Sequence, residues 1–457
     1  MDAGEDGHIR TGTVWTATAH AITSIIGSGV LTLPWSVAQL GWIIGPIILF
    51  FFACVTYYTA ILLSDCYRSP DLVNGRRNYT YIDAVRVCLG AKDVVLCGIV
   101  QYGVLWGSII GYTIATAISM AALKRSICFH KNGHDATCEV SGNLYMIIYG
   151  AMEIVLSQCP SLEKVTWLSY IAATTSFAYS LIAAFLCVVK FATNHEFKGT
   201  LMGAKMGHGV SPPLRTWHAF QALGNIAFAY TYSQLLIEIQ DTLKSPPPEN
   251  KTMKKATSYS IGATTIFYVT LGCMGYVAFG NDAPGNILTG FYEPFWLIAI
   301  ANLSVTIHLV GAYQVFAQPI YAVYEKVLAS KWPTSSFLTK VYTIKFPCTN
   351  PWNFKFTLCT LVLRTMFVIL TTLISMMFPF FNAVVGLLGS LAFWPLTVYY
   401  PVRMYMVQTK VERRSRKWMG LQILSMLCFV ATLLSGIGSV ADVIGSFKHA
   451  KLFHIEL

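Results

Sequence analysis

The sequence is 457 residues long, and 55% of its residues are apolar whereas only 12% are charged. So little polar material cannot cover the surface of a soluble globule of this length, which excludes an ordinary water-soluble protein. Long apolar stretches recur along the chain, each near or above the roughly 20 residues that cross about 30 Å of hydrocarbon as a helix. An outer-membrane barrel would instead show short strands of alternating polarity. The composition therefore predicts an all-α integral membrane protein whose main solvent is the lipid bilayer.

Residues 1–13 form a polar leader without the basic, apolar and small-residue succession of a cleaved signal peptide. We therefore expect the first apolar segment to stay in the protein. Eleven spans are predicted, at residues 14–40, 42–67, 94–123, 144–158, 165–189, 217–239, 258–279, 294–323, 356–377, 381–406 and 418–447.

The fourth span is short and contains Glu153, so the distribution of basic residues is needed to decide whether it exists. With eleven spans and a cytoplasmic N-terminus, the inner side holds more than twice as many of the 32 lysines and arginines as the outer side. Without the fourth span the excess moves outside, so the positive-inside rule favours eleven spans and an extracellular C-terminus. The net charge of +11 then reflects topology and attraction to anionic lipid, and nucleic acid is not expected as a partner.

Of the twelve cysteines, only Cys128 and Cys138 fall in a predicted outer loop. An oxidising compartment would permit a disulfide between them. The other cysteines lie in spans or face the cytosol, and no pair has the spacing of zinc ligands, so no metal is expected.

The middle of the first span, residues 24–34, is rich in glycine and serine and ends at Pro34. These residues weaken a helix. One interpretation is close packing between helices through small residues. The other is an unwound hinge whose free N–H groups bind an anionic carboxylate. The residues concerned are Ser24, Ile25, Gly27, Ser28, Gly29 and Val30.

A second irregular segment, residues 224–232, lies in the sixth span and combines a glycine with polar and aromatic side chains. If spans one to five and six to ten are inverted repeats, the first and sixth spans are in corresponding positions. Paired interruptions of this kind indicate the midplane site of a transporter. The candidate binding residues here are Ala227, Phe228, Tyr230 and Tyr232.

Polar residues at membrane depth are costly unless they are paired. His20 and His308 could exchange a proton near neutral pH, or each could be a neutral histidine held by a neighbouring hydroxyl or carbonyl. Glu153 is a third candidate for proton coupling. Gln101, Tyr102 and Asn382 either line the same cavity or make hydrogen bonds between helices.

Three further charged residues have other expected roles. Glu238 is a further acidic candidate, but it lies near the inner end of its span, which favours a helix-terminal role. Arg364 is expected to pair with an acid or with freed carbonyl groups. Asp442, in the last span, is interpreted as a structural hydrogen-bonding residue and not as a proton relay.

At several places the sequence resembles the plant amino acid permease family, the amino acid/auxin permease branch of the APC superfamily. The similarity runs nearly end to end. The motifs are GTVWTA at 12–17, His20, IGSGVL at 26–31, AQLGW at 38–42, YTY at 79–81, FAY at 228–230, SPPPE at 245–249, and His308 with QVFAQP at 314–319.

The resemblance implies a LeuT-like fold with a five-plus-five inverted repeat and one extra C-terminal helix. The first repeat would be residues 14–190, an outer loop 191–216, the second repeat 217–406, and the last helix with its outer tail 407–457. It also implies a plasma-membrane symporter that imports neutral and acidic amino acids with protons by alternating access. Residues 24–30 would hold the substrate carboxylate and residues 228–232 its ammonium group and side chain.

No covalent step is needed for transport, so no enzyme activity and no cofactor other than the coupling proton are expected. No protein partner is predicted. A channel would require a filter motif, which is not found, and a receptor would be expected to carry a signalling domain or a long cytoplasmic tail.

Overall fold

In this computed structural model the described residues are 10–133, 136–138, 140–158, 166–203, 212–345 and 353–449. Most of the polar leader, the start of the predicted fifth span at Val165, part of the outer loop and the end of the C-terminal tail lie outside them. The described chain forms two compact units. Unit 1 comprises Met1–Val104, Ser180–Phe291 and Asn382–Lys448, and unit 2 comprises Leu105–Tyr179, Tyr292–Phe381 and His449–Leu457.

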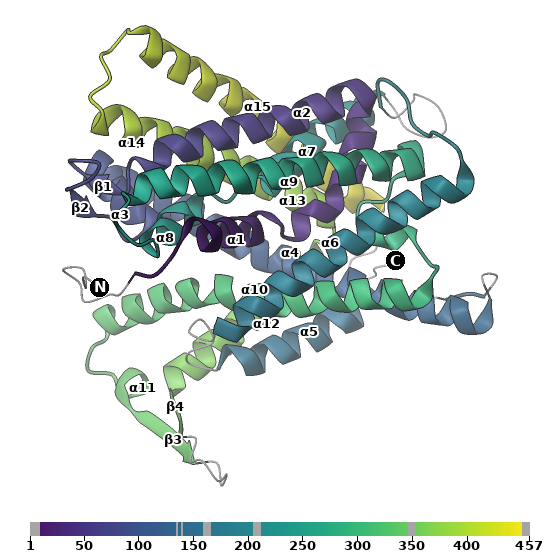
Figure 1. Ribbon diagram of the computed structural model, residues 1–457. Coiled ribbons are helices and arrows are strands. Elements are labelled where there is room, and N and C mark those ends of the chain that lie inside the picture. Colours follow the sequence, from purple (N-terminus) through teal and green to yellow (C-terminus); the bar gives the residue numbers. More distant parts are fainter. Residues whose placement is uncertain are drawn as a thin grey trace. The chain divides into compact units, whose positions relative to one another are not determined.

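Almost all regular structure is helical (Figure 1). The longer helices are α1 (Val14–Ile25), α2 (Leu33–Ser64), α3 (Tyr81–Leu89), α4 (Ala91–Asn132), α5 (Gly142–Ser157), α6 (Thr166–Asn194), α7 (Pro212–Ala229), α9 (Glu249–Phe279), α10 (Phe295–Lys331), α12 (Leu358–Met377), α13 (Phe381–Ala392), α14 (Tyr400–Gln408) and α15 (Arg416–His449). The short ones are η1 (Ser28–Thr32), η3 (Ser233–Leu235), α8 (Leu236–Asp241), η4 (Gly280–Asp282), η5 (Ile287–Gly290), α11 (Ser336–Thr339) and the π-helical η6 (Phe393–Tyr399).

Eight helices in the described part of the chain are long and apolar enough to cross a membrane. Three predicted spans are not among these eight helices, and the structure explains each case. The first and sixth are interrupted, and the fourth corresponds to α5, which has only 16 residues. The protein is therefore a mostly helical membrane protein.

The boundary between the first two predicted spans lies at Gly41, inside the continuous element α2. Gly41 has a φ of 83°, a left-handed conformation that side chains with a Cβ rarely adopt. A Cβ there would also collide with the backbone of Leu201 and Met202. A kink at Gly41 thus separates the two spans, where the sequence predicts the boundary.

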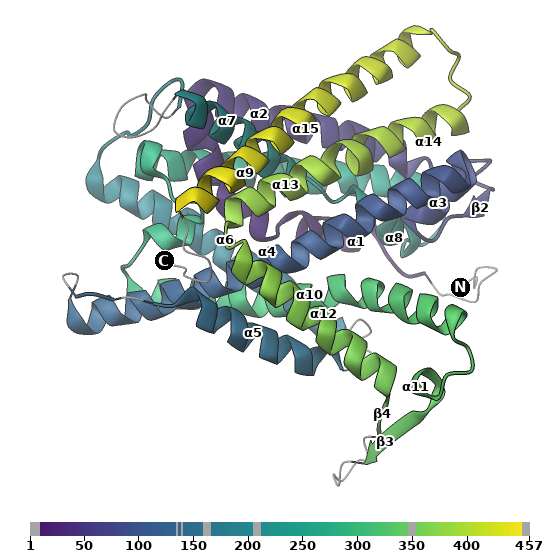
Figure 2. The same cartoon turned by 180° about the vertical axis from the view of Figure 1, so that it is seen from behind.

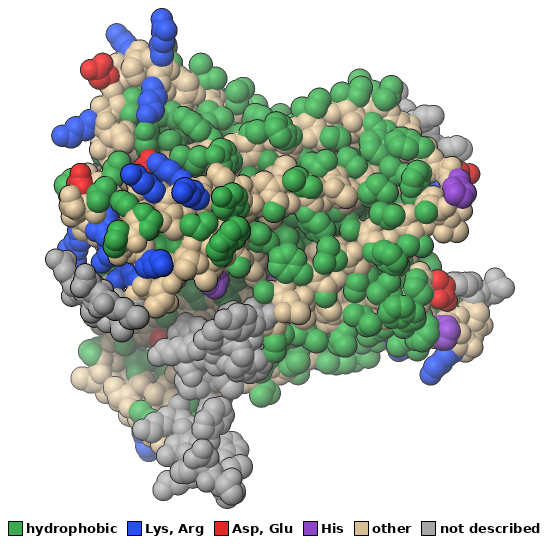
Figure 3. Space-filling model, viewed as in Figure 1, with side chains coloured by type: hydrophobic (Ala, Val, Ile, Leu, Met, Phe, Trp, Pro, Cys, Tyr) green, Lys and Arg blue, Asp and Glu red, His purple; other side chains and the backbone are tan. Residues whose placement is uncertain are grey.

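Within unit 1, α2, α7 and α9 lie side by side, and α1 packs on α9 (Figure 1). On the face in Figure 3, hydrophobic side chains cover most of the surface, as expected for contact with lipid. Lysine and arginine side chains gather at the end where α3, α14 and the strands β1 and β2 lie. This charge distribution is the one that the positive-inside rule leads us to expect of a cytoplasmic end.

Two short hairpins interrupt the helical architecture. In unit 1, β1 (Arg68–Ser69) pairs with β2 (Arg76–Arg77), antiparallel, with Arg68 opposite Arg77. In unit 2, β3 (Val341–Lys345) pairs with β4 (Asn353–Thr357), with Val341 opposite Thr357. Both fall in loops that the sequence places in the cytosol, where water can hydrogen-bond to the open edges of a sheet.

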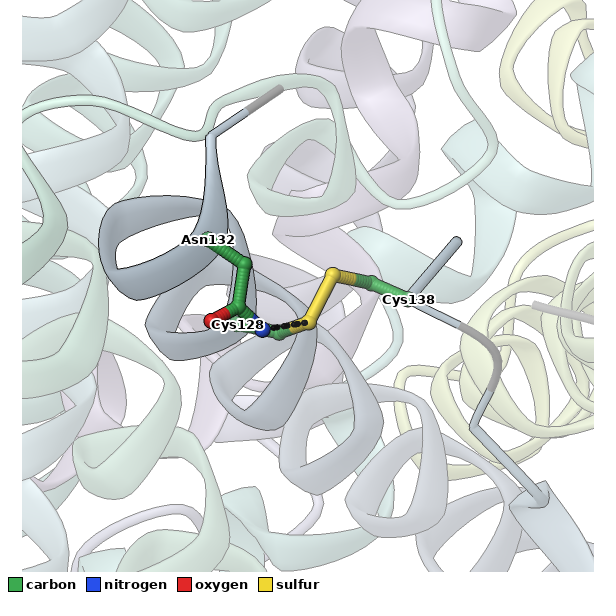
Figure 4. The surroundings of a disulfide bond; sticks show 3 residues. All are labelled: Cys128, Asn132 and Cys138. Atoms are coloured by element: carbon green, nitrogen blue, oxygen red, sulfur yellow. Dashed lines mark hydrogen bonds between the residues drawn. A yellow bond between two sulfur atoms is a disulfide. The ribbon is translucent and has the colours of Figure 1, made fainter. Parts of the chain in front are cut away.

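The predicted disulfide between Cys128 and Cys138 is present, with 6.0 Å between the Cα atoms (Figure 4). It joins the end of α4 to the segment before α5. The Asn132 side chain donates a hydrogen bond to Cys128 Sγ from one turn further along α4. The bridge closes a short loop and removes conformational freedom that the loop would otherwise have.

A cluster of ion pairs holds the first hairpin to the start of α9 in unit 1. The carboxylate of Glu249 is 2.7 Å from Arg68 Nη2 and 3.2 Å from Arg77 Nη2. The Glu249 side chain is only 1% exposed. The hydrogen bond with Glu249 raises the pKa of Arg68 above its ordinary value. Both arginines thus converge on one buried carboxylate.

We expect Glu249→Gln to destabilise unit 1 on the order of 3 kcal/mol, because it leaves two arginines without their carboxylate. A thermal melt of the purified protein would show this as a loss of several degrees. The matched control is Asp83→Asn, which breaks the exposed pair with Arg86 and should cost less than about 1 kcal/mol. Equal melting temperatures for both variants would contradict the structural role of the cluster.

Candidate substrate-binding site

The first predicted interruption is present in unit 1. Thr13 caps the start of α1, and the helix ends at Ile25. Gly27 is extended, with φ −116° and ψ −160°, and η1 then begins at Ser28 and runs directly into α2. The first N–H groups of a helix have no partner within it, so Ser28 and Gly29 lie where the second half of this span presents free donors.

The second predicted interruption is also present. Helix α7 ends at Ala229, and residues 230–232 leave the α-helical path before η3 and α8 continue the span. Tyr230 and Tyr232 are fully buried. The carbonyl of Ala227 accepts from the N–H of Tyr230 and the hydroxyl of Thr231, and the carbonyl of Phe228 accepts from the N–H of Thr231. The negative end of the helix dipole still makes this end attractive to a cation.

The two interruptions meet. A Cβ on Gly29 would lie 2.9 Å from Phe228 Cδ1, so only a glycine allows this approach. Tyr268 of α9 joins both breaks, because its hydroxyl lies 2.6 Å from the carbonyl oxygen of Ile25 and 3.2 Å from that of Ala229. One buried hydroxyl proton is thus shared between the ends of α1 and α7.

Sequence reasoning did not identify Tyr268. It lies in an apolar span with many aromatic residues and has no glycine, proline or charge beside it that would distinguish it. Its role follows only from the tertiary fold, which aligns α9 with the ends of two other helices.

The other predicted lining residues are placed less directly. Ser24 donates its hydroxyl to the carbonyl of His20, and Gln101 and Tyr102 are half-buried on α4. Neither of the α4 side chains makes a hydrogen bond to the breaks within the described residues. Asn382 packs against Gly285, since a Cβ on that glycine would lie 2.6 Å from Asn382 Nδ2.

His20 is exposed and lines a hollow of about 360 Å³ together with residues at the start of α1. Arg10 and Asp241 also line it, and they form an ion pair of 2.9 Å. The hydroxyl of Tyr67 donates to the same carboxylate at 2.6 Å. This network ties the start of the described chain to the end of α8.

Glu153 lies in unit 2 on α5 and is completely buried. Gln314 Nε2 donates to one of its oxygens at 2.6 Å and to Ser157 Oγ at 3.1 Å. The other oxygen of Glu153 has no hydrogen-bond partner among the described residues. That second oxygen can therefore take up a proton without breaking a hydrogen bond that the carboxyl already makes.

His308 and Arg364 also belong to unit 2. His308 is buried, and its Nδ1 is 2.9 Å from the carbonyl oxygen of Ala172. Arg364 pairs with Glu325 at 3.1 Å and donates to the carbonyl of Ser157 at 2.7 Å. Both partners predicted for Arg364, an acid and a freed carbonyl, are therefore present.

Glu238 accepts a hydrogen bond from the N–H of Tyr81 at the start of α3. Its helix-terminal interpretation is consistent with this contact, although the helix end that it caps is that of α3 and not that of its own span.

The arrangement in unit 1 offers donors for an anion and acceptors for a cation at two adjacent helix ends. Such a pair of opposite charges fits a zwitterion. The described residues contain no group of three or more His, Cys, Asp or Glu that could hold a metal ion.

Comparison with known proteins also identifies a membrane transporter of amino acids. The family described as "Transmembrane amino acid transporter protein" matches residues 10–445. Amino acid permease 2 of Arabidopsis thaliana is 55% identical over 452 residues, which cover 98% of this chain and 91% of that protein. Amino acid permease 4 of the same plant is 54% identical, with coverage of 98% and 97%.

Two solved structures have a similar fold. MhsT, in complex with L-phenylalanine, aligns with a TM-score of 0.54 at 12% identity, covering 94% of this chain and all of that one. The inward-facing conformation of Mhp1 aligns with a TM-score of 0.53 at 12% identity, covering 96% and 92%. Both belong to the LeuT-like fold class. This chain therefore belongs to the transmembrane amino acid transporter family, whose members are permeases for amino acids and not enzymes.

Proposed function

We propose that this protein is a proton-coupled symporter that imports neutral and acidic L-amino acids by alternating access. The observation that carries the proposal is the contact of two interrupted helices through Gly29, Phe228 and Tyr268. The substrate carboxylate would bind the N–H groups at Ser28 and Gly29, and its ammonium group the carbonyl end of α7. Coupling to a proton supplies about 2.3 kcal/mol per 100 mV of membrane potential.

The proposed topology has eleven spans, in two inverted repeats of five with one extra helix, in the plasma membrane. The N-terminus is cytoplasmic and the C-terminus extracellular. The gathering of basic side chains at one end supports this orientation. Spans one, two, six and seven would move as one bundle, and all four fall in unit 1. The transporter needs no cofactor besides the proton and no protein partner.

Three residues are proposed for proton coupling, namely Glu153, His308 and His20. Glu153 is the strongest of them on geometric grounds, because it is buried at membrane depth with one unused oxygen. His308 is buried but already bound to a carbonyl, and His20 is exposed beside a hollow.

The carboxylate site is tested by comparing an amino acid with its decarboxylated amine. Loss of the carboxylate removes charge-assisted hydrogen bonds. We therefore expect the amine to bind at least ten-fold more weakly, which corresponds to a loss of about 1.4 kcal/mol in binding free energy. Competition with uptake of a labelled amino acid into reconstituted vesicles measures this difference. Equal competition by the two compounds would refute the site.

Two glycine variants separate the binding interpretation of the first break from the packing interpretation. A Cβ on Gly27 would meet no heavy atom within 4 Å among the described residues, whereas one on Gly29 would press on Phe228. Gly27 lies in the proposed carboxylate site, where the added Cβ would contact the substrate and no described protein atom. Gly27→Ala should therefore weaken substrate binding several-fold and leave the melting temperature unchanged. Gly29→Ala should lower the melting temperature. If Gly27→Ala lowered stability without affecting binding, packing would be the better explanation.

Proton coupling is tested with Glu153→Gln, His308→Ala and His20→Ala. Glu153→Gln keeps the size of the side chain but cannot ionise, so we expect uptake to lose its dependence on external pH. Substrate uptake and proton influx are measured together across a pH series. Glu293→Gln, whose side chain is 54% exposed, is the control. A normal pH profile in all three variants would remove these residues from the coupling step.

A further inference from the structure

A polar seam runs through unit 1 between α7, α13 and α15. Figure 2 shows the ribbons of these three helices. Helix α7 contributes His218, Gln221 and Asn225, which are spaced by three and four residues and so share one face. Helix α15 contributes Ser435, Ser439 and Asp442 with the corresponding spacing. We call these six residues the seam.

Glycines bring the two polar faces together. A Cβ on Gly386 of α13 would lie 3.1 Å from Gln221 Cγ, 3.2 Å from Asn225 Oδ1 and closer still to Ser439 Oγ. A Cβ on Gly224 would collide with Ser435 Oγ. The seam therefore passes between three helices whose backbones approach closely.

Most of the seam is buried and incompletely hydrogen-bonded. Gln221, Asn225 and Ser439 are fully buried, and Ser435 is nearly so. Within the described residues, no partner exists for Gln221 Oε1, for either polar atom of the Asn225 amide, or for the two serine hydroxyls. Buried polar atoms at membrane depth are costly without partners, and water is the usual one in a polar site.

One end of the seam reaches the surface. His218 Nε2 is 3.3 Å from Asp442 Oδ1, and Gln221 Nε2 donates to Asp442 Oδ2 at 3.1 Å. The side chains of His218 and Asp442 are 24% and 18% exposed. This end adjoins the loop that the topology places outside the cell.

The charged groups around this pair are few. Trp35 of α2 contacts the His218 ring edge-on, and neither α2 nor α13 contains Asp, Glu, Lys, Arg or His. Arg215, on the same helix as His218, donates to the carbonyl of Met202. Among the described side chains, the ion-pair partner of His218 is Asp442.

The other end of the seam reaches the candidate substrate site. Asn225 lies one turn before the end of α7 at Ala229. A Cβ on Gly389 of α13 would lie 2.9 Å from the backbone nitrogen of Phe228, so α13 packs directly on the break. The seam thus joins the partly exposed His218–Asp442 pair to the interruption of α7.

We propose that single bound waters bridge the side chains of the seam and form a path along which an external proton, bound first by the His218–Asp442 pair, reaches the break in α7. A hydronium ion outside gives its proton to the pair and becomes water. The pair then passes the proton to water in the seam and returns to its starting charge. This inference rests on the proposed proton coupling and adds to it an external binding site and a route.

The geometry favours a path over the purely structural role that the sequence suggests for Asp442. A structural network would satisfy the polar atoms that it buries. Here the carboxylate is bonded, but the atoms deeper in the seam are left without protein partners. From the His218–Asp442 pair inward, more polar atoms lack a protein partner: one oxygen on Gln221, then both polar atoms of the Asn225 amide. Waters bound in a row could bond to these atoms.

The test uses the full-length protein in vesicles with a fixed internal pH. Uptake of a labelled neutral amino acid and proton influx are measured as the external pH is varied. For Asp442→Asn and His218→Gln we expect the proton concentration at half-maximal uptake to rise at least three-fold. Substrate affinity at saturating acidity should stay within two-fold of wild type.

Matched controls are His130→Gln and Glu293→Gln, which alter another exposed His–carboxylate pair, with 3.9 Å between its atoms, outside the seam. Both should keep the wild-type profile. If wild-type uptake depends on acidity but both seam variants keep the wild-type profile, the seam proposal is refuted and proton coupling is not. Uptake by the wild type that does not depend on pH would overturn proton coupling and the seam with it.

A second measurement does not depend on whether the variants fold. A cryo-EM map at a resolution that shows water should contain ordered water between Gln221, Asn225 and Ser439. A map in which these side chains bond to one another and leave no density between them would overturn the path.

Discussion

Hydrocarbon offers no hydrogen bonds, so every backbone polar group at membrane depth needs a partner from the protein, from water or from a ligand. This constraint makes a broken helix inside a bilayer costly, and unit 1 contains two of them. Tyr268 satisfies part of the need, because its hydroxyl lies against the last carbonyl groups of both α1 and α7. The start of η1 and the end of α7 also carry partial charges of opposite sign from the helix dipoles. A zwitterion fits such a pair of charges, so the constraint that makes the breaks costly also favours the binding site proposed there.

Close approach of backbones is the second requirement, and glycine meets it in two different ways. Gly29 allows the first break to touch Phe228, while Gly386 and Gly389 allow α13 to press on α7 and α15. In a bilayer, helices associate through packing and interhelical hydrogen bonds because lipid supplies no hydrophobic drive between them. Small residues and buried polar side chains therefore occur together in unit 1. The packing that stabilises the helices also creates the space in which polar atoms face one another.

The parts of this structure that could be predicted from sequence depend on local patterns. Glycine, serine and proline in residues 24–34 predict a break, and α1 ends at Ile25 within that segment. The boundary between the first two spans at Gly41 and the Cys128–Cys138 bridge likewise follow from local composition and topology. Tyr268 and the His218–Asp442 pair could not be found in this way, because their partners lie on helices distant in sequence. The two hairpins were also missed, since short strands in polar loops carry little periodic signal.

The last helix illustrates how much two faces of one segment can differ. One side of α15 is exposed and apolar, as expected of a surface in contact with lipid; its residues include Ile423, Met426, Leu427, Val430, Leu433, Ile437, Val440 and Ile444. The other side carries Ser435, Ser439 and Asp442 against α7. A helix that only filled space beside the bundle would be stabilised by small apolar residues on that inner side, since a partly buried carboxylate must be hydrogen-bonded at a cost in desolvation. The proposed proton route explains this polar face, and it gives α15, which lies outside the two proposed repeats, a part in the proposed transport cycle.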